Sequence, residues 1–413
     1  MPQPSEPAGS GSTQPFGALV RQKRREQGWS LRDLGDNIRF NRGYIGHVEK
    51  GEKFPHRRFA ELADSALGCS GTLTEVWELE AEDRKRSELV GRLLTASVTD
   101  SLRLIATTDE RLTSNDIDIE VDRLAIAYMG NAPAPMLQEA VSLRSEILHR
   151  LRYQNYQSHD LAGLYVALGH VQGVLAYAAL DLGNADAAST HIEAAWTCAE
   201  RADDDALRSW VRGTQSLVAR FQANYGQALE YVRDGLRYPA SGAGRIRLLC
   251  GMAQCHANLG DSAGTNSALD TARDERDRLS TPDTLGGIFE FSVAKQHYYA
   301  SSSLIWLDGK GNAERAAQEA TEAITRWKSE PPETRSLDDE ALAQVYQGTA
   351  HLQLGDLDAA AIAVRPILDL PPERQISWIK KRLDRLGSLL RAAPFHGAAS
   401  ANDLYGEIRN VVT

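Results

Sequence analysis

A cluster of basic side chains early in the sequence has the chemistry to bind a polyanion. Between Phe16 and Gly68 there are eleven lysines and arginines against seven acidic residues, although the whole chain has a formal net charge of −10. The rest of the chain is therefore strongly acidic. A basic segment attracts phosphate groups, while an acidic remainder is repelled by them. This charge distribution favours contact with nucleic acid through the basic segment.

Sequence patterns for catalysis and for metal binding are missing. There is no G-x-S-x-G elbow, no glycine-rich phosphate loop ending in Lys-Ser or Lys-Thr, and no H-E-x-x-H. The cysteines form no C-x-x-C pair and have no histidine at metal spacing, so we expect buried free thiols at Cys69, Cys198, Cys250 and Cys255. We therefore expect neither an enzyme nor a cofactor.

The basic segment divides into short amphipathic helices joined by tight turns. A first helix ends at Gly28, and Ser30 caps a second helix, with Asp33 at the reciprocal capping position. Asn41 caps a third helix, which ends at Gly51. The turn between the second and third helices is short enough to force a sharp crossing. That crossing is typical of a helix-turn-helix.

The stretch from Phe16 to Leu79 resembles the phage-repressor-like helix-turn-helix regulators of bacteria, also called the xenobiotic-response-element family. The resemblance is carried by Arg21, Arg24, Gly28-Trp29-Ser30, Leu34, Ile38, the run from Tyr44 to Gly51, Pro55, Leu62-Ala63 and Ala66-Leu67-Gly68. Within that run, the string I-x-x-V-E-x-G follows a capped helix in register. The resemblance implies a DNA-binding transcriptional regulator.

In that family the third helix lies in the major groove, and exposed residues near its N-terminus meet base edges. Ile45 and Val48 would face the core, so the resemblance assigns base contacts to Arg42 and His47. Arginine can donate two hydrogen bonds to guanine O6 and N7, and histidine can donate to a base acceptor. The alternative for either side chain is an ordinary solvated position on a helix.

Phosphate contacts are expected where helices start, because free N–H groups and the helix dipole attract anions there. Leu31 replaces the glutamine that the family often carries, which would pass a phosphate contact to Arg32. Arg39 replaces the usual turn glycine and would need a positive φ, at a cost of roughly 1 kcal/mol. The expected DNA backbone contacts are Arg21, Arg24, Arg32, Asn41, Tyr44, His56, Arg57 and Arg58.

The remainder of the chain reads as helices separated by Gly, Asn and Asp, with similar junctions that recur. If Ala188, Ala228, Thr265, Ala316 and Ala360 are equivalent points, the successive spacings are 40, 37, 51 and 44 residues. The residue twelve positions earlier is small in four of the five cases; the exception, Leu304, makes the repeat at Ala316 the least regular. These junctions resemble tetratricopeptide repeats, although every interval exceeds the ideal of roughly 34 residues.

Helix pairs of this kind stack into a superhelix with a concave groove. A repressor-like head on such a body resembles bacterial regulators with C-terminal repeat sensors. The groove candidates are polar and aromatic residues on the first helix of each pair: Tyr165, His170, Gln215, Arg220, Gln254, His256, Gln296, His297, Tyr298, Tyr299, Gln344, Tyr346 and Gln347. As effector-binding residues we single out Gln254, His297, Tyr298 and Tyr346. The acidic body favours a neutral or cationic effector, or a basic segment of a partner protein.

The sequence thus predicts an all-α protein, with an N-terminal helix-turn-helix bundle followed by an α-solenoid of tetratricopeptide-like helix pairs. We expect a disordered tail at 1–13, a DNA-binding domain at 14–70, a helical connector at 71–160 and the repeat domain at 161–413. We also expect a homodimer on double-stranded DNA, with a peptide, small-molecule or protein effector. No run of about 18 apolar residues is present, so a cytoplasmic protein is expected. The alternatives are a scaffold or adaptor whose head binds protein, and an enzyme with a regulatory head.

Overall fold

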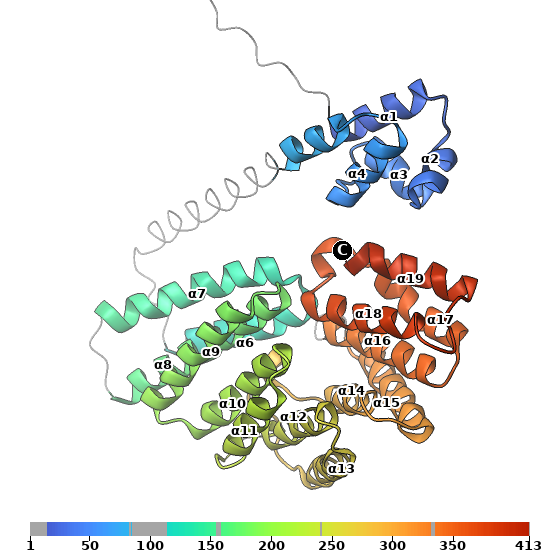
Figure 1. The fold of residues 1–413 in the computed structure, drawn as a ribbon. Helices are drawn as coiled ribbons and strands as arrows, with labels where there is room; N and C mark the ends of the chain where they lie inside the picture. The colour runs from blue at the N-terminus through green and yellow to red at the C-terminus, as the bar shows by residue number, and fades with distance from the viewer. Residues whose placement is uncertain are drawn as a thin grey trace, which may run out of the picture. The chain divides into compact units, whose positions relative to one another are not determined.

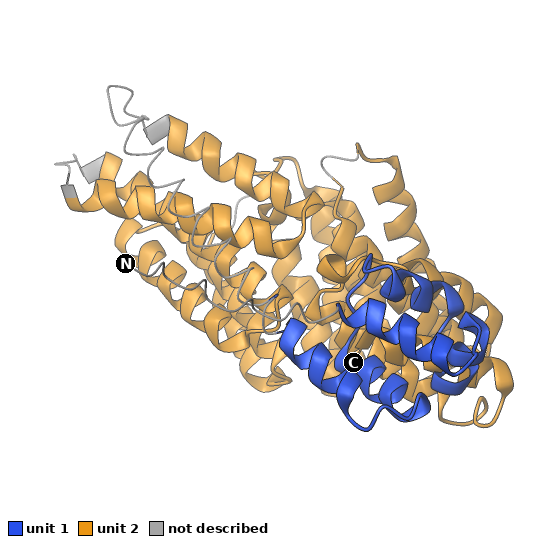
Figure 2. Cartoon of the chain, turned by 90° about the horizontal axis from the view of Figure 1, so that it is seen from above, with its two compact units in different colours: residues 1–111 blue, residues 112–413 orange. Residues whose placement is uncertain are grey.

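A computed structural model of the chain describes residues 15–81, 84, 114–153, 158–239, 242–331 and 335–412. Every regular element in these ranges is an α-helix or a short 3-10 helix, which confirms the all-α class (Figure 1). The chain divides into two compact units, residues 1–111 and 112–413 (Figure 2). The tail expected at 1–13, and a helical spacing predicted from Leu89, Val90, Leu93 and Leu94, fall outside the described residues.

The first unit is a bundle of short helices around one apolar core. Its helices are α1 (Phe16–Glu26), α2 (Leu31–Ile38), α3 (Arg42–Glu49), α4 (Arg57–Ala66) and a further helix over 72–81. The core is formed by the side chains that the apolar spacing placed on the inner faces, among them Phe16, Val20, Leu34, Ile38, Ile45, Val48 and Phe59. The predicted sequence of capped helices is confirmed.

The turns around α2 have the predicted chemistry. The Ser30 hydroxyl accepts a hydrogen bond from the Asp33 amide, and the Asp33 carboxylate accepts one from the Ser30 amide. Arg39 ends α2 in the left-handed conformation with φ 58°, as expected for a residue in place of glycine. At Asn41 the side-chain oxygen accepts from the Gly43 amide at 2.7 Å and starts α3. The crossing of α2 and α3 is therefore fixed at both ends of the turn.

The second unit consists of helices packed against their chain neighbours. The helices are α6 (Ser114–Gly130), α7 (Pro133–Tyr153), α8 (Ser158–Asp181), α9 (Ala185–Ala202), α10 (Asp205–Phe221), α11 (Tyr225–Gly235), α12 (Gly244–Asn258), α13 (Ser262–Arg278), η1 (Gly287–Phe289), α14 (Val293–Leu304), α15 (Lys310–Ser329), α16 (Leu337–Gln353), α17 (Leu357–Leu368), η2 (Pro372–Arg374), α18 (Ser377–Leu390) and α19 (Ala399–Val412). The pairs α8–α9, α10–α11, α12–α13, α14–α15 and α16–α17 contain the five junctions found in the sequence. Two of the helices, α6 and α7, fall in the segment expected as a connector, and they pack on α8 within this unit.

Small residues allow close approach within the pairs. All five points used to align the repeats, from Ala188 to Ala360, are fully buried. A Cβ on Gly348 would stand 2.6 Å from Val364 Cγ1, so α16 and α17 approach closely there. The irregular repeat also forms its pair, α14 and α15, and Leu304 is buried at the end of α14. At the junction between α10 and α11, Ala223 takes the left-handed conformation that glycine more often adopts, with φ 61°.

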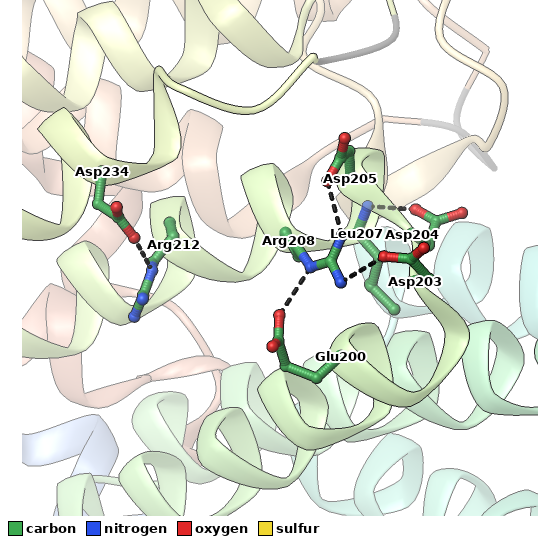
Figure 3. Close-up of polar contacts among 8 residues, drawn as sticks. All are labelled: Glu200, Asp203, Asp204, Asp205, Leu207, Arg208, Arg212 and Asp234. Atoms are coloured by element: carbon green, nitrogen blue, oxygen red, sulfur yellow. Dashed lines mark hydrogen bonds and ion pairs between the residues drawn. The ribbon is translucent and has the colours of Figure 1, made fainter.

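Ion pairs on α10 link it to its neighbouring helices (Figure 3). The Arg208 guanidinium lies among three carboxylates, with Glu200 at 2.7 Å, Asp203 at 2.8 Å and Asp205 at 2.7 Å. One turn later, Arg212 pairs with Asp234 of α11 at 2.6 Å. These two arginines therefore have their charge compensated within the fold.

The helical array closes back on itself, because α18 packs against α8 and α16 packs against α6. Ser377 at the start of α18 donates a hydrogen bond to the carbonyl of Leu180, and Lys381 donates to the carbonyl of Phe221 at 2.6 Å. By length and composition alone, the stretch Asp160–Asp181 of α8 is apolar enough to cross a membrane, but 61% of its 18-residue apolar window is buried inside the structure. That burial is what the central helix of this domain requires.

Candidate nucleic-acid interface and ligand pocket

The exposed face of α3 is held in place by its buried face. Ile45 and Val48 are buried, as the sequence predicted, while Arg42 at the first position of the helix is exposed. Within the described part of the chain, Arg42 makes no ion pair. Its guanidinium is therefore available to a base edge or a phosphate in front of the helix N-terminus.

The second residue expected to contact bases, His47, lies on the same helix but is already engaged. Its Nδ1 atom is 2.5 Å from Oε2 of Glu52, and both side chains are exposed. Hydrogen bonding to His47 is the main cause that lowers the pKa of Glu52, which favours its charged form. A base contact by His47 would have to coexist with this carboxylate or displace it.

The expected backbone contacts differ in how free they are. Arg21 and Arg58 are exposed and form no ion pair among the described residues, and Arg32 is only 3.9 Å from Asp36 on a fully exposed surface. Arg57 is held between Glu61 and Glu78, each at 2.9 Å. Exposed ion pairs of this kind are weak and can exchange for a phosphate.

Two further predicted contacts, Asn41 and His56, precede the first residues of α3 and α4. The side chain of Asn41 is the cap of α3, so its oxygen is occupied while its amide group remains outside the cap hydrogen bond. His56 is exposed at the helix start. Both positions are where free backbone N–H groups can receive an anion.

Arg24 is a correction to the expected DNA contacts. Only 7% of its surface is exposed, and its guanidinium forms a two-pronged ion pair with Glu49, with Nε–Oε1 at 2.6 Å and Nη2–Oε2 at 2.7 Å. It also donates to the carbonyl of Trp29 at 2.6 Å. Arg24 therefore joins α1 to the end of α3 inside the bundle, where DNA cannot reach it.

Tyr44 is half-buried and packs mainly against aromatic neighbours. Its ring stacks on Phe40 with centroids 5.5 Å apart and meets Phe59 edge-on at 5.8 Å. Burial raises the pKa of its hydroxyl to about 12, so it remains protonated. Lys53 lies 4.9 Å from the ring centroid. Tyr44 thus packs mainly against the core beneath the exposed face of α3.

The second unit contains a deep pocket lined by helices from α6 to α18. Its cavity volume is about 110 Å³, and the empty space that includes the part open to solvent is about 1050 Å³. The lining combines aromatic rings with charged groups: Tyr128, Met129, Tyr177, Asp181, Leu217, Arg220, Tyr225, Arg247, Gln254, Asn258, Ile288, Glu290, Phe291, Lys295, Tyr298, Tyr299, Ser302, Trp306, Ser336, Asp338, Asp339, Leu342, Tyr346, Ile376, Trp378 and Arg382.

Three of the four residues singled out for effector binding come together in this pocket. Tyr298 and Tyr346 stack on each other with centroids 5.6 Å apart, and Gln254 donates a hydrogen bond to Ser302. The fourth, His297, is not part of the lining, and its Nδ1 atom pairs with Glu319 of α15 at 2.6 Å. The buried acids of the pocket could not be selected from the sequence, because nothing in their spacing sets them apart from the acids of solvated helix faces.

The acids of the pocket are buried and partly neutralised. Burial raises the pKa of Asp338 to about 7, although Arg374 at 2.9 Å opposes the shift. Burial also raises the pKa of Asp339 and holds that of Asp181 well above its ordinary value. The Tyr128 hydroxyl donates to Asp181 at 2.5 Å. At neutral pH these side chains therefore carry less negative charge than their number suggests.

Two cations of the pocket are satisfied by neutral groups. Arg247 donates to the Trp210 carbonyl at 2.9 Å, the Thr214 hydroxyl at 2.9 Å and the Tyr177 hydroxyl at 3.1 Å. Lys295 donates to the carbonyls of Gly287 and Glu290, at 2.9 Å and 2.7 Å. No ion pair to either is found within the described residues. Neutral protein groups thus solvate both charges. Burial lowers the pKa of Lys295, and the nearby Asp339 and Glu290 oppose that shift.

Comparison with known proteins identifies the first unit. Residues 15–77 match the model of a helix-turn-helix domain, which agrees with the geometry of α2 and α3. The narrower phage-repressor-like family stays a prediction. No curated protein matches the chain.

Two solved structures show a distant likeness. PlcR of Bacillus thuringiensis, in complex with the peptide PapR7 and DNA, is 13% identical with a TM-score of 0.34, over 64% of this chain and 95% of that chain. A monomeric mutant of IFIT1 with Gppp-AAAA is 10% identical with a TM-score of 0.42, over 95% of this chain and 81% of that chain. Both scores lie below 0.5, so the helix-turn-helix match carries the assignment of the first unit and these two structures add nothing to it.

Proposed function

We propose that the protein is a sequence-specific DNA-binding transcriptional regulator. The observation that carries this proposal is the helix-turn-helix domain itself, in which a capped α3 presents an unpaired Arg42 on its exposed face. An arginine in this position can bind guanine with two hydrogen bonds. Arg32, which lines the same surface hollow as Arg42, and the exposed Arg21 and Arg58 are the proposed contacts to the DNA backbone.

We propose that the second unit binds an effector in its pocket and thereby changes DNA binding. DNA recognition needs only the first unit, whereas the second unit contains a pocket with an aromatic and charged lining. In this proposal the protein acts as a cytoplasmic homodimer, because one small head covers only half of a two-fold symmetric operator. The repeats would be of the tetratricopeptide type, and no catalytic step is assigned to them.

The experiment that tests the DNA-binding proposal is selection of sites from a random pool of duplex DNA by the full-length protein. We expect one preferred sequence, and affinity that falls steeply with salt. Arg42→Ala should lose about 1–3 kcal/mol of discrimination at one base pair. Arg58→Ala should weaken all sequences alike.

The same two variants also distinguish DNA binding from the alternative function, in which the first unit binds protein. An adaptor whose head binds protein would enrich no sequence and would respond to neither substitution. If a sequence is enriched but Arg42→Ala leaves every preference unchanged, α3 is not the recognition helix. Sedimentation of the protein with the selected duplex then measures whether two copies bind one site.

A further inference from the structure

We propose that Arg220 forms an anion-binding subsite in the pocket of the second unit. The effector would then be a compact molecule with an aromatic or apolar body and one anionic group, either a carboxylate or a phosphate. This inference deepens the proposed function and rests on its claim that the pocket receives an effector. It reverses the expectation, drawn from the acidity of the chain, that the effector is neutral or cationic.

The contrast among three arginines on α10 carries the first step. Arg208 and Arg212 are held by carboxylates of neighbouring segments (Figure 3). Arg220, near the end of the same helix, lines the pocket and forms no ion pair and no side-chain hydrogen bond within the described residues. Carboxylates of the fold therefore balance the charges of Arg208 and Arg212, whereas no carboxylate among the described residues balances the charge of Arg220.

The burial of the Arg220 guanidinium indicates that it needs an acceptor for its hydrogen bonds. Arg220 is only 8% exposed, and its Nε atom is buried without a hydrogen-bond partner. Its nearest described aromatic contact is the Tyr299 ring, whose centroid is 5.7 Å away. A buried donor without an acceptor costs folding free energy, and a charged one costs more. An acceptor from outside the chain would remove that cost.

The surroundings favour a negative charge on that acceptor. Arg382, which also lines the pocket, donates to the Tyr346 hydroxyl at 3.2 Å and has no carboxylate partner among the described residues. Arg247 and Lys295 likewise are bound only by neutral groups. Three of the four acids that line the pocket are engaged: Asp181 and Asp339 accept hydrogen bonds from hydroxyl groups, and Asp338 pairs with Arg374. The fourth, Glu290, is exposed. The interior of the pocket is thus more positive than the chain as a whole.

The walls of the pocket define the rest of the effector. Tyr298 and Tyr299 meet edge to face at 5.4 Å, and Tyr298 continues into the stack with Tyr346. Trp306 and Trp378 line the same space. Such walls bind a flat or branched apolar body, while a guanidinium fixes its anionic end. Both halves of the proposed ligand therefore have a partner in the structure.

A pair of fluorescent dyes tests the subsite without knowledge of the natural effector. Anilinonaphthalene sulfonate has an aromatic body and one anionic group, and phenylnaphthylamine is its counterpart without the sulfonate. Full-length protein should bind the sulfonate dye, and Arg220→Gln should weaken that binding about tenfold or more. The same substitution should leave the affinity of the uncharged dye unchanged. Arg212→Gln, the matched change on the same helix outside the pocket, should alter neither affinity.

Thermal unfolding provides a second readout in case a variant folds poorly. Arg220→Gln should not lower the unfolding midpoint of the second unit, because it removes a buried charge without a partner, whereas Arg212→Gln should lower it. Displacement of the sulfonate dye by a short apolar peptide with a free C-terminus, but not by its amide, identifies a carboxylate source. Displacement by phenyl phosphate identifies a phosphate source.

The subsite is refuted if the sulfonate dye fails to bind the wild-type protein, or if it binds Arg220→Gln equally well. It is also refuted if both dyes lose affinity together, since that result describes a collapsed pocket. Because these titrations contain no DNA, a failure here leaves the DNA-selection experiment untouched. Failure of DNA selection, in turn, would not change the dye result.

Discussion

Replacing Arg24 with methionine should destabilise the first unit by about 3–5 kcal/mol, which is the usual cost of removing one partner of a buried ion pair. In this case the substitution leaves the Glu49 carboxylate 7% exposed without its two hydrogen bonds, and it takes a donor from the Trp29 carbonyl. A domain of this size has a total stability of roughly 3–10 kcal/mol. The loss is therefore comparable with the stability of the whole unit.

Hydrogen exchange of the full-length protein measures this effect where it occurs. Amides in the centres of α1 and α3 should exchange about a hundredfold to a few thousandfold faster in Arg24→Met. The double variant Arg24→Met, Glu49→Met should recover most of the protection, because it removes both charges and keeps an apolar contact. Amides of the second unit serve as the internal control. A loss of stability below about 1 kcal/mol, or a double variant as unstable as the single one, would mean that water reaches Glu49 and that the ion pair does not stabilise the interior of the bundle.

Three other predictions test separate parts of the structure. In thermal unfolding, Gly35→Ala should destabilise the first unit by about 1–2 kcal/mol, because its Cβ would stand 2.6 Å from the Phe40 carbonyl oxygen. Gly46→Ala is the control and should be neutral or stabilising, because the nearest atom to its Cβ would be 3.8 Å away. The folded-state pKa of Asp338, about 7, lies above the unfolded value of about 3.9. The stability of the second unit should therefore fall as the pH rises from about 4 to 7 and then level off. If the unfolding midpoint of Asp338→Asn changes with pH as steeply as that of the wild type, this prediction is wrong. Glu52→Gln should strengthen DNA binding by roughly two- to fivefold, since it releases His47 and removes an acid near the phosphates, and an unchanged titration curve at low salt would place Glu52 away from DNA.

Local patterns were sufficient to predict the first unit. The spacing of Ile45 and Val48 fixed which side of α3 is buried, and Ser30 and Asn41 marked where two helices begin. The role of Arg24 was missed because its partner lies 25 residues away. One signal was present, since Glu49 directly follows Val48 on the inner side of α3, and a carboxylate there requires a cation.

The pocket could be predicted only in part. Helical position alone placed Tyr298 and Tyr346 on the first helices of their pairs, and both residues line the pocket. Which of the many charged residues enter the pocket depends on how α10, α12, α14, α16 and α18 meet, and no local pattern encodes that assembly. The difference between Arg212 and Arg220 is set by a single acid on α11, which the sequence does not connect to either residue.

The contact between α18 and α8 affects the order in which the two units can fold and complete their sites during synthesis. Ser377 and its acceptor Leu180 are separated by 197 residues, and Trp378 and Arg382 on the same helix form part of the pocket wall. In an open repeat array, each pair depends only on its neighbours and the first pairs can mature alone. Here a nascent chain has a first unit able to fold early, but it has no complete ligand site until α18 has left the ribosome. If the pocket binds the proposed effector, every newly made molecule is unresponsive to it during that interval.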